Sequence, residues 1–285
     1  MRTPSPFADG RVIARRALLA IAIAFAAATL PAPAFAATLE EAYVAYTRGD
    51  YSEALKIFVP LAEEGNRDAQ YSVGVIYSNG RGLPQSYADA AKWFRRAADK
   101  GQPGAQYDLG VLYAKGQGVP QSWSEAAKWF RMAADQGKAS AQYNMGFLYS
   151  QGQGVGQDYA QAAKWYRMAA EQGDVDSQNR LAALYLAGDG VRQDYAEAAR
   201  WYRKAAEQGD NDAQNELGSL YGNGHGVEKD YVEAYRWFEL AATRNPGTDF
   251  ETRENAARNR DMVATRMTPA EIAEAQKRAK AWKPQ

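Results

Sequence analysis

The stretch SAQYNMGFLYSQGQGVGQDYAQAAKWYRMAAEQG, residues 140–173, is the unit that the rest of the chain copies. Its glutamine, the tyrosine of its first half and its tryptophan each recur at a spacing of 36 residues. The three columns are Gln70, Gln106, Gln142, Gln178 and Gln214; Tyr77, Tyr113, Tyr149, Tyr185 and Tyr221; and Trp93, Trp129, Trp165, Trp201 and Trp237. Five copies at one fixed period indicate a stacked repeat array, in which neighbouring units bury each other's apolar faces.

Each copy predicts two helices. Ala141, Met145 and Leu148 share one face of a helix over residues 139–150, and a second apolar set shares one face over residues 159–172. The second helix follows a short oxygen-bearing residue with an acid or amide three positions later, the pattern of a capping box. These N-caps are Asp50, Ser86, Ser122, Asp158, Asp194 and Asp230. The helix ends before a glycine that can adopt the left-handed conformation, in the column Gly65, Gly101, Gly137, Gly173 and Gly209.

These columns resemble the Sel-one-like repeat (SLR) family, a relative of the tetratricopeptide repeat. The resemblance rests on AQYxxGxxY at 141–149, GxGV at 152–155 and DxxxAxxWYRxAAxxG at 158–173, and it extends over residues 68–242. It implies an all-α fold, a right-handed α-solenoid of stacked antiparallel helix pairs, whose members mostly act as protein-binding adaptors without shared catalytic residues. Ala182 departs from the pattern, because four other copies have glycine in that column, and we expect its methyl group to alter the helix contact locally.

The chain divides into segments of different character. Residues 1–36 predict a signal peptide, because a basic region precedes an uncharged, mostly apolar run at 17–30 and a small-residue cleavage site between Ala36 and Ala37. The mature protein is therefore expected to be exported, periplasmic or extracellular, without a stable membrane span. The remaining segments are a divergent helix pair at 38–65, repeats at 66–101, 102–137, 138–173, 174–209 and 210–245, and C-terminal capping helices at 249–282.

Composition excludes several classes of protein. The chain has no cysteine, which excludes disulfides, zinc–thiolate sites and a lipidated cysteine. Residues 1–36 hold four arginines and one aspartate, so their removal from 34 basic and 34 acidic side chains leaves 30 and 33. This slightly acidic balance argues against nucleic acid or an anionic membrane as the main partner.

Catalytic chemistry has little support in the sequence. The only histidine, His225, lies in a column where other copies have Arg81, Gln117, Gln153 and Asp189, as a solvent-facing loop position would. We therefore predict that the chain is not an enzyme and has no catalytic residue, metal site or cofactor.

Two regular columns have plain structural interpretations. The arginines Arg95, Arg131, Arg167 and Arg203 each precede an acid by four residues, which favours solvated ion pairs over a polyanion track. The tryptophan column favours packing between helix pairs over sugar stacking.

A protein or peptide partner is expected on the first helices, which line the concave side of tetratricopeptide-like solenoids. Aromatic and amide side chains can anchor a peptide and bond its backbone. The predicted partner-binding residues are Tyr71, Tyr107, Tyr143, Phe147, Asn179 and Asn215. The alternative is that the tyrosines belong to the repeat consensus and are half-buried. The favoured function is a non-catalytic protein-binding adaptor of the cell envelope; the alternative is a binder of cell-wall glycan or peptide.

Overall fold

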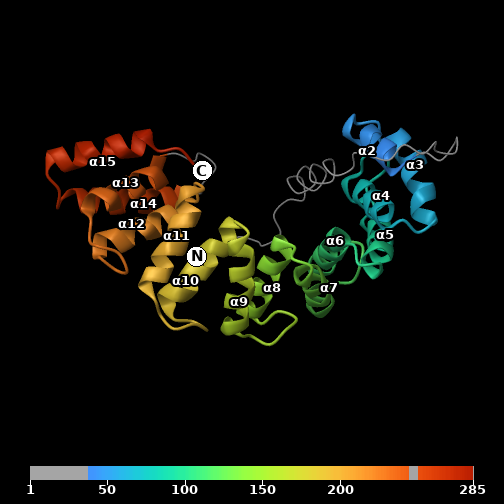
Figure 1. Cartoon of the computed structure of the whole chain (residues 1–285), viewed down its shortest axis with the longest axis horizontal. Helices are drawn as coiled ribbons and strands as arrows, with labels where there is room; N and C mark the ends of the chain where they lie inside the picture. Colours follow the sequence, from blue (N-terminus) through green and yellow to red (C-terminus); the bar gives the residue numbers. More distant parts are fainter. Residues whose placement is uncertain (1–37, 244–249, 285) are drawn as a thin grey trace, which may run out of the picture. The chain divides into compact units, whose positions relative to one another are not determined.

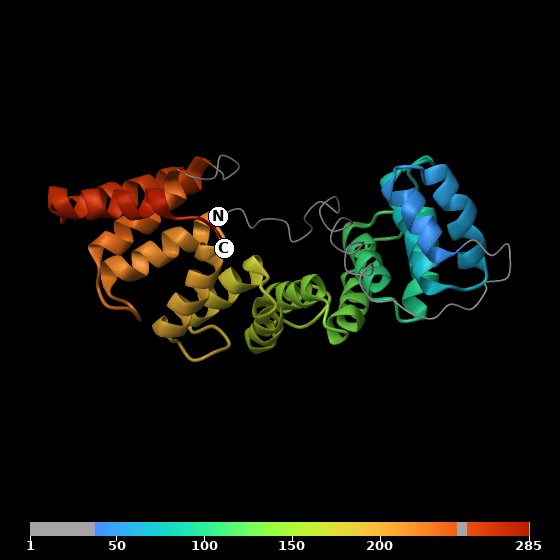
Figure 2. The same cartoon turned by 45° about the horizontal axis from the view of Figure 1, so that its top comes forward.

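The computed structural model describes residues 38–243 and 250–284, which form fourteen helices, α2 to α15, and no strand (Figure 1). The chain separates into two compact units, residues 1–136 and 137–285. Within each unit successive helices pack as antiparallel pairs, so the all-α fold of stacked helix pairs is confirmed (Figure 2). The predicted signal peptide and its cleavage site at Ala36 and Ala37 lie outside the described residues, and no helix in the described part is long and apolar enough to cross a membrane.

The first unit contains three helix pairs. Its helices are α2 (Leu39–Thr47), α3 (Tyr51–Glu63), α4 (Arg67–Asn79), α5 (Tyr87–Asp99), α6 (Pro103–Lys115) and α7 (Trp123–Asp135). The second unit contains three further repeats and two additional helices. These are α8 (Ala139–Gln151), α9 (Tyr159–Glu171), α10 (Val175–Ala187), α11 (Tyr195–Glu207), α12 (Asn211–Asn223), α13 (Tyr231–Thr243), α14 (Phe250–Ala264) and α15 (Pro269–Ala281).

The predicted caps are present, but the capping boxes are mostly one-sided. In α5 the Ser86 hydroxyl accepts from the backbone N–H of Asp89, as expected. The Ser86 N–H, however, donates to the carbonyl of Tyr77 at 3.0 Å, and the same bond recurs in the later repeats. Because the backbone N–H of Ser86 already has a partner, the side chain of the acid three residues later is not needed as its acceptor. Among the described helices only α2 and α15 have both bonds of the box.

A buried glutamine joins three helices in the repeats. Gln178 is 3 % exposed, and its Nε2 donates to the carbonyl of Ala170 in the preceding second helix at 3.1 Å. Its Oε1 accepts from Gln208 at the end of its own second helix at 2.9 Å. The bond to the preceding helix also occurs at Gln70, Gln106 and Gln214, and the bond from the C-cap glutamine also occurs at Gln106 and Gln142. The glutamine column is thus a structural clasp.

Close packing explains the glycines of the first helices. A Cβ atom on Gly146 would lie 2.6 Å from the ring of Tyr166, and Gly74, Gly110 and Gly218 meet the rings of Phe94, Phe130 and Phe238 in the same way. Ala182 is fully buried in the same cluster as Tyr202. The expected local change at Ala182 stays a prediction.

The tryptophan column packs as expected, whereas the arginine column does not pair as expected. From the second repeat onward each tryptophan of the column is at most 7 % exposed. These are Trp129, Trp165, Trp201 and Trp237. Among the described arginines of the column, only Arg131 lies within 4 Å of its acid, at 3.9 Å from Asp135. Arg95, Arg167 and Arg203 instead donate to a tyrosine hydroxyl of the next first helix, Tyr113, Tyr185 and Tyr221 respectively. The prediction of solvated ion pairs is wrong for these three, because a tyrosine of the neighbouring repeat lies within reach.

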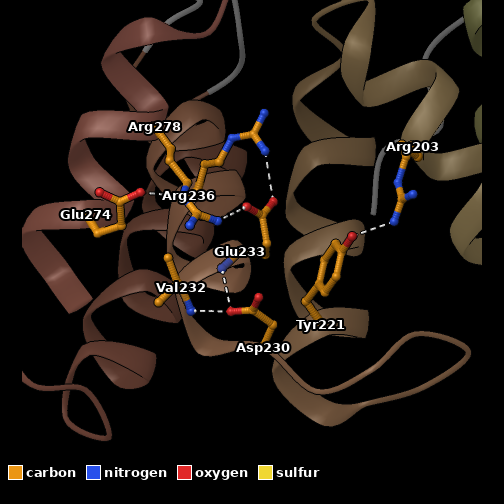
Figure 3. A network of polar contacts seen from close by, with 8 residues as sticks. All are labelled: Arg203, Tyr221, Asp230, Val232, Glu233, Arg236, Glu274 and Arg278. Atoms are coloured by element: carbon orange, nitrogen blue, oxygen red, sulfur yellow. Dashed lines mark hydrogen bonds and ion pairs between the residues drawn. The ribbon is translucent and has the colours of Figure 1, made fainter.

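The second unit ends in a cap built by α14 and α15. Both helices pack on α13, and α14 also touches α12 (Figure 1). Glu233 of α13 accepts from Arg236 at 2.8 Å and from Arg278 of α15 at 2.9 Å, and Arg278 also binds Glu274 (Figure 3). Ala275 and Ala279 of the predicted apolar face of α15 are buried.

The loop glycines allow a matched test of the stacking. Gly190 and Gly173 both have positive φ, at 67° and 92°. A Cβ atom on Gly190 would lie 2.2 Å from the backbone of Tyr159 in the preceding repeat, whereas one on Gly173 would meet nothing within 4 Å. We expect Gly173→Ala to cost about 1–2 kcal/mol of unfolding free energy, the cost of a left-handed alanine. Gly190→Ala should cost clearly more, by about 1–3 kcal/mol, because the backbone must also move. Urea unfolding of both variants measures the difference, and equal costs would contradict the close stacking.

Candidate functional site

The predicted anchors lie on α4, α6, α8, α10 and α12, the first helices of the repeats. In the first unit Tyr71 is half-buried, with its ring centroid 5.8 Å from that of Phe94. Its hydroxyl bonds Asp108 of the next first helix, and burial, followed by that carboxylate, raises its pKa well above the ordinary value. Tyr107 is 5 % exposed and lies 5.6 Å from Phe130. Each tyrosine thus packs on the same second-helix ring as the glycine three residues later in its own helix.

In the second unit Tyr143 is 7 % exposed, with its ring 5.8 Å from that of Tyr166. Burial raises the pKa of its hydroxyl, which accepts a hydrogen bond from Arg180 of α10. Phe147 is half-buried on the same helix. The alternative interpretation of the tyrosines as packing residues therefore describes the surroundings of Tyr107 and Tyr143, while their role in partner binding stays a prediction.

The predicted asparagines take part in contacts between neighbouring helices. Asn179 is half-buried and donates from Nδ2 to Oδ1 of Asp210 at 3.0 Å. Asn215 is half-buried and accepts at Oδ1 from Asn259 of α14 at 2.9 Å. In the second unit Phe147, Asn179 and Asn215 therefore lie on three successive first helices, α8, α10 and α12.

Carboxylates that the sequence analysis did not single out gather beside these asparagines. Asp210 caps α12 by accepting from the N–H of Ala213 at 2.7 Å. Burial, with a smaller contribution from Asp212 and Asp176, raises the pKa of Asp210 to about 6. The surrounding protein also partly shields the carboxyls of Asp176, which is exposed as a residue, and of half-buried Glu216 from water, and this desolvation raises the pKa of both.

A comparison of columns could have found this acidic face. The column of Asp176 and Asp212 holds Gly104 and Ser140 in the two preceding repeats. The column of Asp210 holds Gln102 and Lys138. Asp68 of α4 begins this column, the two middle repeats lack the acid, and Asp176 and Asp212 restore it in the last two repeats. Arg180, whose positive charge lowers the pKa of Asp176 against the effect of burial, is the basic residue among them.

Groupings typical of a metal site are missing from this surface. Over residues 38–243 and 250–284 no group of three or more histidine or acidic side chains is arranged to hold a metal ion. His225 is exposed, and its ring stacks on Tyr195 with centroids 5.0 Å apart. The described first-helix face offers hydrogen bonds and negative charge, which suit binding.

The repeat geometry agrees with the comparison to known families. The family profile of the Sel1 repeat matches residues 67–102, 103–138, 139–174, 175–210 and 211–246. The chain belongs to the Sel1 repeat family. Its matched repeats begin one residue later than the segments predicted from the sequence. Sel1 repeats form scaffolds typical of protein–protein interaction and are generally not catalytic.

Two solved Sel1-type structures are similar to this chain. A protective antigen of uropathogenic Escherichia coli strains with an SLR fold is 38 % identical, with a TM-score of 0.74 over 85 % of this chain. The chain spans about half of that antigen, 52 % of its length. A Sel1 repeat protein from Oxalobacter formigenes is 30 % identical, with a TM-score of 0.73 over 85 % of this chain and 99 % of that one. No curated protein matches the chain.

The burial of Tyr143 predicts the effect of its removal. Tyr143→Ala should lower the free energy of unfolding by about 3–5 kcal/mol, because it leaves a cavity beside Tyr166. Tyr143→Phe keeps the ring and should cost about 1 kcal/mol, for the lost hydrogen bond. Chemical denaturation of both variants tests this, and a small loss in Tyr143→Ala would show that the ring is a surface anchor.

The raised pKa of Asp210 predicts a pH effect. The folded protein holds this proton more tightly than the unfolded chain, so its stabilising contribution is full below pH 3.8 and is lost as pH rises through about 6. Asp210→Asn keeps a capping oxygen without an ionisable group. Between pH 4 and pH 8 the unfolding free energy of the variant should gain about 1–3 kcal/mol relative to the unmodified protein. A difference that stays constant over this pH range would refute the assignment.

Proposed function

We propose that this Sel1 repeat chain is a non-catalytic protein-binding adaptor of the cell envelope. Its binding surface is the face of the first helices, and in the second unit that face includes Phe147, Asn179 and Asn215. The family supports the general class, since Sel1 repeats form scaffolds for protein–protein interaction.

The observation that carries this proposal is the contrast between buried aromatic columns and polar first helices. Trp165 and Trp201, which a sugar binder could use as stacking platforms, are 7 % and 2 % exposed. Asp176 and Asp212 are exposed, and Glu216 is half-buried, on the first helices. Such a surface favours a protein segment that carries cationic side chains and backbone donors, because carboxylates only accept hydrogen bonds when ionised.

The envelope location rests on the order of residues at the start of the chain. Basic residues, an apolar run and small residues before Ala37 support export. Sequencing the N-terminus of the protein recovered from cells checks this part. A chain that still begins before residue 17 would contradict it.

One exposed acid gives a sharp test of the binding surface. Asp176→Lys should weaken capture of the protein partner from envelope extracts by about tenfold or more, because it places a cation opposite the partner's cations. Glu171→Lys is the matched control, since Glu171 is exposed on a second helix and its change should leave capture unaffected.

Crosslinking and mass spectrometry of the captured material identify the partner for both variants, and thermal melts confirm that both fold. Equal losses in the two variants would place the binding surface elsewhere. A glycan array run in parallel addresses the alternative, because binding to a cell-wall glycan without any captured protein would contradict the adaptor proposal.

A further inference from the structure

The first helix pair, α2 and α3, has an outer face. In an internal repeat the corresponding face is covered by the preceding repeat. Trp93 of α5 packs on the apolar cluster of α2, α3 and α4, and Trp129 of α7 packs on the cluster of α5 and α6. Ile57 of α3 stands 36 residues before Trp93 in the same column. The tryptophan column therefore faces the preceding repeat, and Ile57 faces the place where no repeat is present within the described residues.

This face forms an open groove between α2 and α3. Val44, Ala45 and Ile57 supply its apolar surface, and Val44 is 42 % exposed. The rim is acidic, with Glu40, Glu41, Asp50 and Glu53 against Arg48. Glu41 and Asp50 also cap their helices, and Glu53 pairs with Lys56 at 3.0 Å. The groove thus combines a small apolar floor with an excess of negative charge.

The last helix, α15, has an exposed face at positions that are buried in an internal second helix. α15 begins with the Thr268 cap and Glu271 at its third position, just as α11 begins with Asp194 and Glu197. In this register Ala273, Gln276 and Lys280 correspond to Ala199, Tyr202 and Ala206. In α11 these three positions are buried in the core shared with α12. In α15 they are exposed.

The exposed face of α15 is small and basic. A shallow hollow runs along it, lined by Ala273, Gln276, Lys277, Lys280 and Ala281. The alanines permit close approach of another helix, and the lysines oppose the sign of the rim at α2 and α3. Positions that are buried on the internal helix α11 are therefore exposed on α15 within the described residues, although Gln276 bonds the hydroxyl of Tyr235 in α13.

We propose that copies of this chain stack head to tail, with α15 of one copy docked in the groove of α2 and α3 of the next. The proposal names a second copy because both surfaces occur on the same chain, carry opposite charge and correspond to the two sides of an internal repeat junction. The contact is heterologous, so it leaves a free groove and a free α15 and extends into a row of copies. This self-association is independent of the partner-binding face proposed above.

Sedimentation velocity of the full chain over a micromolar concentration series tests the association. The weight-average mass should rise with concentration and should fall when salt is raised from about 0.05 M to about 0.5 M, because the charges of the rim are solvent-exposed. A monomer at every concentration in low salt would overturn the proposal.

Charge exchange tests the docking geometry. Glu40→Lys and Lys277→Glu should each weaken association by about tenfold, because each places like charges across the junction. An equimolar mixture of the two variants should associate as the unmodified protein does, since the new positive charge at position 40 then faces the new negative charge at position 277 and the unchanged ends meet each other. Lys164→Glu, an exposed lysine on the internal helix α9, is the matched control and should leave association unchanged.

Restoration in the mixture also separates this junction from association through the apolar run at residues 17–30, which neither change alters. Association that is unaffected by both variants, or that is weakened in each and not restored in the mixture, would refute the head-to-tail contact. Circular dichroism of each variant ensures that a loss of association is not a loss of fold.

Discussion

The buried amide of one glutamine is the constraint on which the stacking depends. At Gln178 the donor end satisfies a carbonyl at the end of the preceding second helix, and the acceptor end holds the last residue of its own second helix. The carbonyl of Ala170 also accepts from the backbone N–H of Gly173, so the glutamine adds a second bond that ties the two helices together. A side chain with one donor group and one acceptor can join both at once, which no apolar residue and no carboxylate can do. The glutamine recurs with each repeat at the fixed spacing of 36 residues.

This way of holding the array together determines what is left for binding. The tryptophans, the aromatic rings over the glycines and the tyrosines on the first helices all contribute to packing between pairs. Hydroxyl groups that would mark surface anchors, such as those of Tyr71 and Tyr143, bond side chains of the next first helix. The accessible chemistry of the second unit is therefore amide and carboxylate chemistry, and burial of Asp210 makes part of it sensitive to pH near 6.

The first and last described helices differ from the internal helices in which of their faces are covered. In internal repeats the ring column of each second helix is buried, packed on the first helix of its own pair, as Tyr166 is on Gly146. At the end of the chain α14 and α15 cover α13, and ion pairs of Glu233 hold α15 there. The face of α15 that contains Ala273, Lys277 and Lys280 nevertheless remains exposed. The lysines at that face carry a positive charge, opposite in sign to the rim of the groove between α2 and α3.

The sequence by itself determined the helix pairs, their caps, the repeat length and the burial of the tryptophans, because these depend on periodicity and on local backbone chemistry. It could not determine where Tyr107, Tyr143 or Arg203 point. The surroundings of each of these side chains depend on a residue of a neighbouring helix, namely Phe130, Tyr166 or Tyr221. Only the tertiary structure, in which neighbouring helices supply those partners, decided that the arginines bond tyrosines and that burial raises the pKa of Asp210.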